Sequence, residues 1–280
     1  MEQIIFTSIV IGCFFCLMEI ESRTQVLALE QNTSRVVPWQ LIFFCLGGVL
    51  LIFSAGFRIG FIDTPAYRMM FDQIDISLAE LTEFGWEYSK EYGFTFFMYA
   101  LRLISKNSQI LIFICSMLII SFNFYLIKKY TIDLSFSLLL FFFTEYLDSM
   151  NIMRQVLVIA LSLLMIPWMR KGYFFYYLLG ILLLSTIHVS VLLWLPFYFI
   201  FRKPVFHPTV IISSIVILLL LFFPYLTGIV TSTLFGENSN YHEYFQSTLY
   251  DYGVGIPRLM IQLAPGFLLL FYELRKRYKK

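Results

Sequence analysis

A few charged or polar side chains stand out because they lie in or beside segments that are otherwise apolar. These candidates for chemistry are Arg58, Asp63, Glu91, Asn151, Arg154, Gln155, His188 and Arg258. A charged group at membrane depth is costly, so one placed there usually faces a partner, a cavity or a substrate. Three of these residues are arginines, and a guanidinium binds phosphate oxygens through paired N–H donors. The residue types therefore indicate a site for a phosphate-bearing ligand.

Three of the candidates have the spacing of one helix face. Arg154 lies three residues after Asn151 and Gln155 lies four residues after it, so both share a face with Asn151 on a helix. A helix N-terminus also attracts anions, which adds to the attraction of the arginine. The alternative is that Arg154 extends its guanidinium to the lipid headgroups and holds no ligand.

Three other candidates could act as a general base. They are Asp63, Glu91 and His188, and a neutral imidazole can accept a proton near physiological pH. Each also has a structural alternative. Asp63 could cap a helix that starts near Pro65, Glu91 could be a solvated loop acid, and a lone histidine is often a hydrogen-bonded interior residue. The sequence alone leaves the choice of base open.

No motif for a metal or an organic cofactor occurs in the sequence. Cys13 and Cys16 form a CxxC pair, but no second pair or nearby histidine accompanies them, which favours buried helix filler. Zinc and calcium spacings, Gly-rich phosphate loops and Ser-His-Asp or HExxH patterns do not occur either. The net charge of +2 gives no basis for binding nucleic acid. We therefore expect no metal and no cofactor.

The composition is that of a membrane protein. Of the 280 residues, 59% are hydrophobic and 14% are charged, whereas a soluble domain has about 25% charged residues. We expect an all-α fold, a polytopic transmembrane helical bundle of about eight to ten spans that forms one integral membrane domain over residues 1–280. The first apolar run has no basic start and no small-residue cleavage site, so we expect a retained span. The candidate spans are 3–19, 38–56, 109–127, 134–147, 150–169, 173–187, 188–201, 209–230 and 257–273.

Basic residues between the spans predict which connections are cytoplasmic. Those assigned to the cytoplasm are at 128–129, 170–171 and 202–203, in the C-terminal tail, and at Arg23 and Arg35 in the loop after the first span. The assignment leaves outer loops at 57–108 and 231–256. Segment 93–104 in the first loop is apolar but too short to span, so we expect short amphipathic or re-entrant helices there. This layout brings Arg154 and His188 to the same, outer end of their helices.

Four short motifs follow one another along the chain. They are Arg58…Asp63-Thr64…Tyr67…Phe71, Glu91-x-Gly93-Phe94, Asn151-x2-Arg154-Gln155 and His188-x-Ser190. In this order they resemble the EpsG/Wzy family of bacterial polysaccharide polymerases. The resemblance covers roughly residues 50–200, with weaker support from Gly255-Ile256-Pro257-Arg258. One departure is Tyr92, which stands where the family usually has proline.

The resemblance implies a glycosyltransferase, a multi-pass enzyme of the bacterial cytoplasmic membrane with a cytoplasmic C-terminus. Such a polymerase transfers a glycan chain from undecaprenyl pyrophosphate to the nonreducing end of another lipid-linked repeat unit, on the outer face of the membrane. The product is a capsule, an exopolysaccharide or an O-antigen. The implied partners are lipid-linked oligosaccharides, membrane lipid, a chain-length regulator and a flippase, with no nucleic acid.

This reaction gives each candidate residue an expected role. The base would be Asp63, Glu91 or His188. The residues expected to bind pyrophosphate are Arg58, Arg154, Gln155 and Arg258. Those expected to contact sugar rings are Tyr67, Trp86, Tyr92 and Asn151.

Three other interpretations fit the same sequence. A lipid-linked sugar flippase or polysaccharide transporter would also need cationic residues, but spread through a cavity open to both sides. A membrane acyltransferase that modifies surface glycans would need a catalytic histidine and a route for the acyl donor. A non-catalytic membrane scaffold would need neither. The one-sided layout of the cationic residues favours the polymerase.

Overall fold

The computed structural model describes residues 39–61, 63–74, 91–131, 134–200, 202–203 and 207–222. Several predicted features lie outside these residues, namely the spans 3–19 and 257–273, the outer loop 231–256, Trp86 and Arg258. Contacts between Cα atoms divide the chain into two compact units, Met1–Tyr198 and Phe199–Lys280. The expectation of one domain stays a prediction.

The regular secondary structure of the described residues is entirely helical, which confirms the all-α class. The elements are α2 (Trp39–Gly56), α3 (Thr64–Asp72), α5 (Tyr92–Ile104), α6 (Gln109–Tyr130), α7 (Leu134–Phe141), the π-helix η2 (Phe142–Tyr146), α8 (Leu147–Ser149), α9 (Met153–Leu163), α10 (Ile166–Lys171), α11 (Phe174–Ser185), the 3-10 helix η3 (Val189–Trp194), α12 (Phe197–Ile200) and α13 (Pro208–Phe222). The last of these lies in the second unit. The predicted span at 188–201 is therefore two short helical pieces, η3 and α12, interrupted at Pro196 because proline cannot donate a backbone hydrogen bond.

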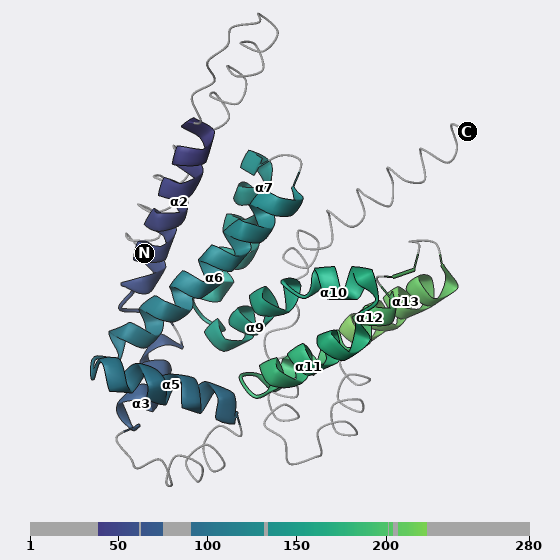
Figure 1. The fold of residues 1–280 in the computed structure, drawn as a ribbon. Helices are drawn as coiled ribbons and strands as arrows, with labels where there is room; N and C mark the ends of the chain where they lie inside the picture. Colours follow the sequence, from purple (N-terminus) through teal and green to yellow (C-terminus); the bar gives the residue numbers. More distant parts are fainter. Residues whose placement is uncertain are drawn as a thin grey trace, which may run out of the picture. The chain divides into compact units, whose positions relative to one another are not determined.

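In the first unit, α2 and α6 lie side by side and run antiparallel (Figure 1). Gly48 of α2 meets the ring of Phe124 near the end of α6, and Gly56 meets Phe113 near its start. A Cβ on Gly56 would lie 2.6 Å from a ring carbon of Phe113, so the glycine permits this close approach. The end of α2 is therefore fixed beside the start of α6.

The segment from α7 through η2 to α8 packs against the same pair of helices. The Tyr146 hydroxyl in η2 donates to the Leu51 carbonyl of α2 at 3.2 Å. Buried side chains of α2, α6 and this segment form one core cluster, which is Phe44, Leu51, Ala55, Ile120, Phe124, Leu138, Phe141, Phe142, Tyr146 and Met150. The chain then enters α9 at the end of the bundle that holds Gly56.

Helices α9 and α10 form one bent apolar segment, residues 153–171. The bend precedes Pro167, whose ring suits the first turn of a new helix. Gly172 ends α10 with φ 82°, a left-handed conformation that favours glycine and turns the chain back into α11. Gly180 of α11 then packs against Met165. The last turn of α6, which begins at Gln109, contains Lys128 and Lys129. The last turn of the bent segment, which begins at Met153, contains Arg170 and Lys171.

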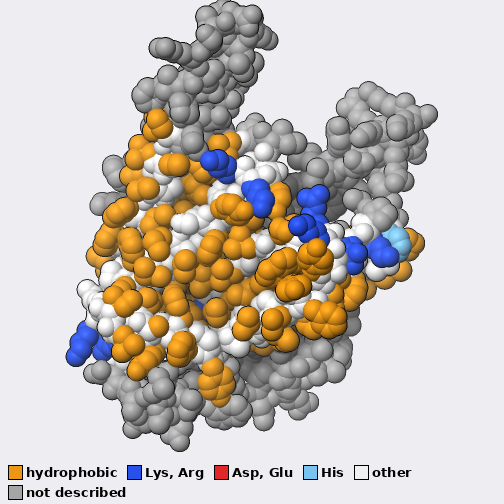
Figure 2. All heavy atoms as spheres, in the orientation of Figure 1, with side chains coloured by type: hydrophobic (Ala, Val, Ile, Leu, Met, Phe, Trp, Pro, Cys, Tyr) orange, Lys and Arg blue, Asp and Glu red, His pale blue; other side chains and the backbone are white. Residues whose placement is uncertain are grey.

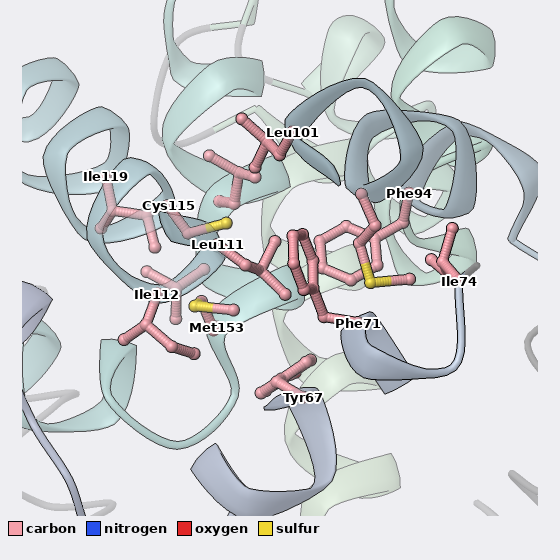
Figure 3. Close-up of a cluster of buried hydrophobic side chains, with 13 residues drawn as sticks. Tyr67, Phe71, Ile74, Phe94, Leu101, Leu111, Ile112, Cys115, Ile119 and Met153 are labelled. Carbon is pink, nitrogen blue, oxygen red and sulfur yellow. The ribbon is translucent and has the colours of Figure 1, made fainter. Parts of the chain in front are cut away.

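The short helices α3 and α5 pack against the first half of α6 (Figure 1). With 13 residues, α5 is about 20 Å long and too short to cross a membrane core. A short helix here is what the sequence predicts, and its re-entrant or interfacial placement stays a prediction. The buried faces of α3 and α5 meet α6 and α9 in the cluster of Figure 3, which includes Tyr67, Phe71, Phe94, Leu101, Leu111, Ile112 and Met153.

Some of the described helices have the length and composition of membrane spans. Gln109–Tyr130 and Met153–Lys171 are long and apolar enough to cross a membrane, and α2 and α11 are shorter apolar helices. Figure 2 shows hydrophobic side chains over most of the described surface on one face. Exposed apolar side chains on this scale suit contact with lipid rather than water. The expected number of spans stays a prediction.

Candidate functional site

One carboxylate joins two of the predicted site residues. Oε2 of Glu91 lies 2.6 Å from Nη1 of Arg154, and Oε1 of Glu91 lies 2.5 Å from Nδ1 of His188. Glu91 directly precedes α5, Arg154 lies in the first turn of α9, and His188 lies between α11 and η3. Because Glu91 is only 6% exposed, it is not a solvated loop acid. It is a buried acid shared by a cation and an imidazole.

Glu91 is placed by a tight contact between the start of α5 and the end of α11. The Gly93 N–H donates to the Thr186 carbonyl at 2.8 Å. The Val189 N–H donates to Oε1 of Glu91 at 3.3 Å. A Cβ on Gly93 would lie 2.9 Å from the carbonyl carbon of Thr186, which is too close for backbone that cannot give way. Glycine is therefore required two residues after the acid.

The guanidinium of Arg154 is held between the acid and two aromatic rings. Its carbon lies 5.6 Å from the ring centre of Tyr67 and 5.4 Å from that of Phe94, which are cation–π distances. The two rings contact each other edge to face. The side chain is still 24% exposed, so a ligand can reach part of it. The contact with Arg154 gives a structural reason for an aromatic residue at Phe94 in the second motif.

Two polar atoms of the predicted site residues lack a hydrogen bond within the described part of the chain. Nε of Arg154 and Oδ1 of Asn151 are buried and lack a hydrogen bond among the residues that the structure describes. Buried polar atoms of this kind are uncommon in native proteins. Nε of Arg68 and Nε of Arg102 share this property among the described residues. Asn151 lies in the turn before α9, which begins at Met153, so it does not share a helix with Arg154 and Gln155 as their spacing predicts.

Arg58 lies beneath this region and is 2% exposed. Its guanidinium donates to Oγ1 of Thr64 at 3.1 Å, to the Ala55 carbonyl at 2.8 Å, and to Oγ of Ser116 at 2.9 Å. It also contacts Sδ of Met153 at 3.4 Å. Burial lowers the pKa of Arg58 to about 10, so the group stays protonated at neutral pH. All three of its nitrogens are thus occupied by neutral protein atoms.

Sequence reasoning missed two polar residues that complete the end of α2. Arg68 donates to the Arg58 carbonyl at 3.0 Å and to Oε1 of Gln109. Gln109 in turn donates to the Gly56 carbonyl. The last carbonyls of a helix lack partners within the helix, and at membrane depth little water is present to supply them. Arg68 could have been found from the sequence because it directly follows Tyr67 within the first motif. Nothing in the sequence points to Gln109.

Asp63 occupies the N-cap position of α3 but makes no capping hydrogen bond with its side chain. The capping interpretation of this residue is therefore wrong, although Pro65 does lie in the first turn of the helix. The carboxylate is half-buried, and it interacts electrostatically with Tyr67, whose pKa is raised mainly by burial. Its role as a base stays a prediction.

The other predicted residues are placed as follows. Tyr92 is 39% exposed on the first turn of α5, whereas Tyr67 is buried under Arg154. Gln155 is half-buried on α9, beside Arg154. Trp86 and Arg258 lie outside the described residues. In the part of the chain that the structure describes, no group of three or more His, Cys, Asp and Glu side chains could hold a metal ion.

Comparison with known proteins shows the family to which the residues of this site belong. No curated protein and no solved structure matches the chain. A sequence model of the EpsG family matches residues 41–280, a range that includes every residue of the contact described above. The family and the apolar helices point to a membrane protein of polysaccharide biosynthesis, with a function of the polymerase type. The chain belongs to the EpsG family.

Proposed function

We propose that the protein is a polysaccharide polymerase of the outer face of the cytoplasmic membrane. It would transfer an oligosaccharide from undecaprenyl pyrophosphate to a hydroxyl at the nonreducing end of a second lipid-linked unit. The observation that carries the proposal is the Glu91 carboxylate, which lies 2.6 Å from an arginine nitrogen and 2.5 Å from a histidine nitrogen. A cation for a leaving anion and a base for an attacking hydroxyl are the two groups that this reaction needs.

Arg154 is the proposed partner of the leaving pyrophosphate. The bond between the sugar carbon and the pyrophosphate oxygen breaks, and the departing oxygen gains negative charge. A guanidinium that is already fixed by Glu91 and two rings can stabilise this charge without reorganising. Nε of Arg154, which lacks a hydrogen bond among the described residues, offers a further donor. Gln155 and Arg258 remain proposed ligands of the same anion.

His188 is the proposed base. If its Nδ1–H donates to Glu91, the neutral ring carries a lone pair on Nε2, which can take the proton of the acceptor hydroxyl. The hydroxyl oxygen then bonds to the sugar carbon as the pyrophosphate leaves. In this scheme Glu91 orients both groups and does not itself take the proton. Asp63 is the second candidate for the base because its carboxylate is not used as a helix cap.

Sugar recognition is assigned to Tyr92, Trp86 and Asn151. Tyr92 is the proposed stacking surface, since its ring is partly exposed next to the acid, and Trp86 is a second. Asn151 offers a buried carbonyl oxygen to a sugar hydroxyl. Tyr67 is buried, so we assign its ring to the support of Arg154. A chain-length regulator and a flippase remain proposed partners.

The one-sided position of these groups is the reason to prefer a polymerase to a flippase. Arg58, Arg68 and Arg154 all lie near the end of the first unit where α2 ends and α6 begins. A transporter would need cationic contacts along the whole crossing. An acyltransferase remains an outcome of the experiment below.

The experiment is reconstitution of the full chain in vesicles with lipid-linked repeat units, followed by gel analysis of glycan length. We expect a ladder of polymers from the wild-type protein, and single units from His188→Asn and Arg154→Ala at equal protein amounts. Arg102→Lys is the matched control, because Arg102 contacts Asp72 and the Lys106 carbonyl instead of Glu91. Vesicle crossing or acyl transfer without any new glycosidic bond would reject the polymerase.

A further inference from the structure

The buried guanidinium of Arg58 ties four helices together. Its partners are Ala55 of α2, Thr64 of α3, Ser116 of α6 and Met153 of α9, at 2.8, 3.1, 2.9 and 3.4 Å. The four contacts involve every nitrogen of the side chain. A planar fork of N–H donors makes such a junction possible, whereas an ammonium group is a single point.

Two of these contacts lead directly to Arg154. Met153 is its neighbour in the chain and the first residue of α9. Thr64 lies one helical turn before Tyr67 on α3, and the Tyr67 ring centre lies 5.6 Å from the Arg154 guanidinium. Arg58 therefore holds both the helix that carries Arg154 and the helix that supports it.

We propose that Arg58 is a positioning residue, which fixes the Arg154 guanidinium over Tyr67 and does not itself contact the ligand. The inference rests on the proposed role of Arg154 in binding pyrophosphate. It reassigns a residue that sequence reasoning expects among the pyrophosphate ligands. The physical reason is that each of its three nitrogens already has a protein partner and only 2% of its surface is exposed.

Accessibility of the two arginines provides the first test. The reconstituted full chain would be treated with phenylglyoxal, which modifies accessible guanidinium groups, and the modified arginines mapped by mass spectrometry. The treatment is repeated with undecaprenyl pyrophosphate present. We expect Arg154 to be modified and to be protected by the lipid, while Arg58 stays unmodified in both samples. Modification of Arg58 that the lipid prevents would overturn the inference in favour of direct binding.

Variants of the junction provide the second test. Arg58→Lys keeps the charge but loses the fork, and the milder Thr64→Val and Ser116→Ala each remove one acceptor. We expect each to lower turnover per folded molecule, tenfold or more for Arg58→Lys, and to change the rate at which phenylglyoxal modifies Arg154. Arg102→Lys, the control, should leave both quantities unchanged. An unchanged Arg154 modification rate in all three junction variants would overturn a positioning role.

The outcome separates this inference from the proposed function. If the lipid fails to protect Arg154 in the wild-type protein, the pyrophosphate site is rejected. The junction variants would still report on whether Arg58 controls Arg154, because the modification rate without lipid needs no substrate. A fall in folded protein alone, with turnover per folded molecule and Arg154 reactivity unchanged, would reduce Arg58 to a purely structural contact.

Discussion

Glu91 and His188 are separated by 97 positions in the sequence, and Oε1 of Glu91 lies 2.5 Å from Nδ1 of His188. The same carboxylate holds Arg154 through its other oxygen at 2.6 Å. A shared carboxylate makes the positions of the proposed base, His188, and of the cation depend on one residue. The first prediction concerns that residue.

Glu91→Gln should fold and should lose most polymerase activity. The amide keeps the shape but loses the charge that pairs with Arg154 and fixes the His188 ring. Loss of an oriented base is worth roughly 10²-fold or more in rate, so we expect turnover to fall by about that factor. The measurement is initial rate of polymer formation in vesicles.

The matched control for Glu91→Gln is Asp72→Asn. Asp72 also pairs with an arginine, Arg102, but at 3.5 Å and with a carboxylate that is more than half exposed. An exposed pair contributes about 0–1 kcal/mol, so this variant should behave as wild type. Equal activity in the two variants would contradict the role given to Glu91.

Gly93→Ala should separate α5 from the end of α11. The new methyl group would press on the backbone of Thr186, which cannot rotate away. We expect a stability loss of about 1–3 kcal/mol, typical of overpacking, together with loss of polymer. Thermal unfolding in detergent measures the first and glycan length the second. Gly47→Ala is the control, since a Cβ there would meet nothing within 4 Å, and it should be neutral or slightly stabilising.

Arg154→Lys should retain the positive charge yet lose activity. The lysine cannot form paired N–H contacts with a phosphate while it also bonds to Glu91. We expect a fall in turnover of about tenfold or more, with little change in thermal stability, because the side chain is partly exposed. Full activity in this variant would mean that only charge matters at this position.

Tyr67→Phe and Tyr67→Leu should differ. Phenylalanine keeps a ring beneath Arg154, whereas leucine removes the cation–π contact, worth about 0.5–2 kcal/mol. We expect near-normal polymer from Tyr67→Phe and shorter polymer from Tyr67→Leu, measured on gels. Indistinguishable polymer from the two variants would argue against the support given by the ring.

Tyr67 also predicts an effect of alkaline pH. Burial raises its pKa, so the unfolded chain releases the phenolic proton at a lower pH than the folded protein does. The resulting contribution to stability is complete below the unfolded pKa of about 10 and is lost as pH rises beyond it. Unfolding of wild type and Tyr67→Phe, compared from neutral to alkaline pH, should show the steeper loss in the wild type.

The sequence by itself determined the fold class and the order of the helices. Runs of apolar residues set the membrane-like helices, and Pro167 and Gly172 set where α9, α10 and α11 break. The sequence also predicted that Arg154 and His188 lie on the same side of the membrane. Two short antiparallel helices fit between the basic connections at 128–129 and 170–171, and two more between 170–171 and 202–203, so the turns near Arg154 and His188 both face the opposite side. The contact of both residues with Glu91 agrees with that layout.

Only the tertiary structure decided which of these two arginines, Arg58 or Arg154, is buried and which is partly exposed. Arg58 and Arg154 look alike in the sequence, since each borders an apolar run. Arg58 is enclosed by side chains from α3, α6 and α9, whereas Arg154 is left partly open beside Glu91. The direction of a side chain at a helix end depends on neighbours that are distant in the sequence, and hydrophobic periodicity carries no information about them.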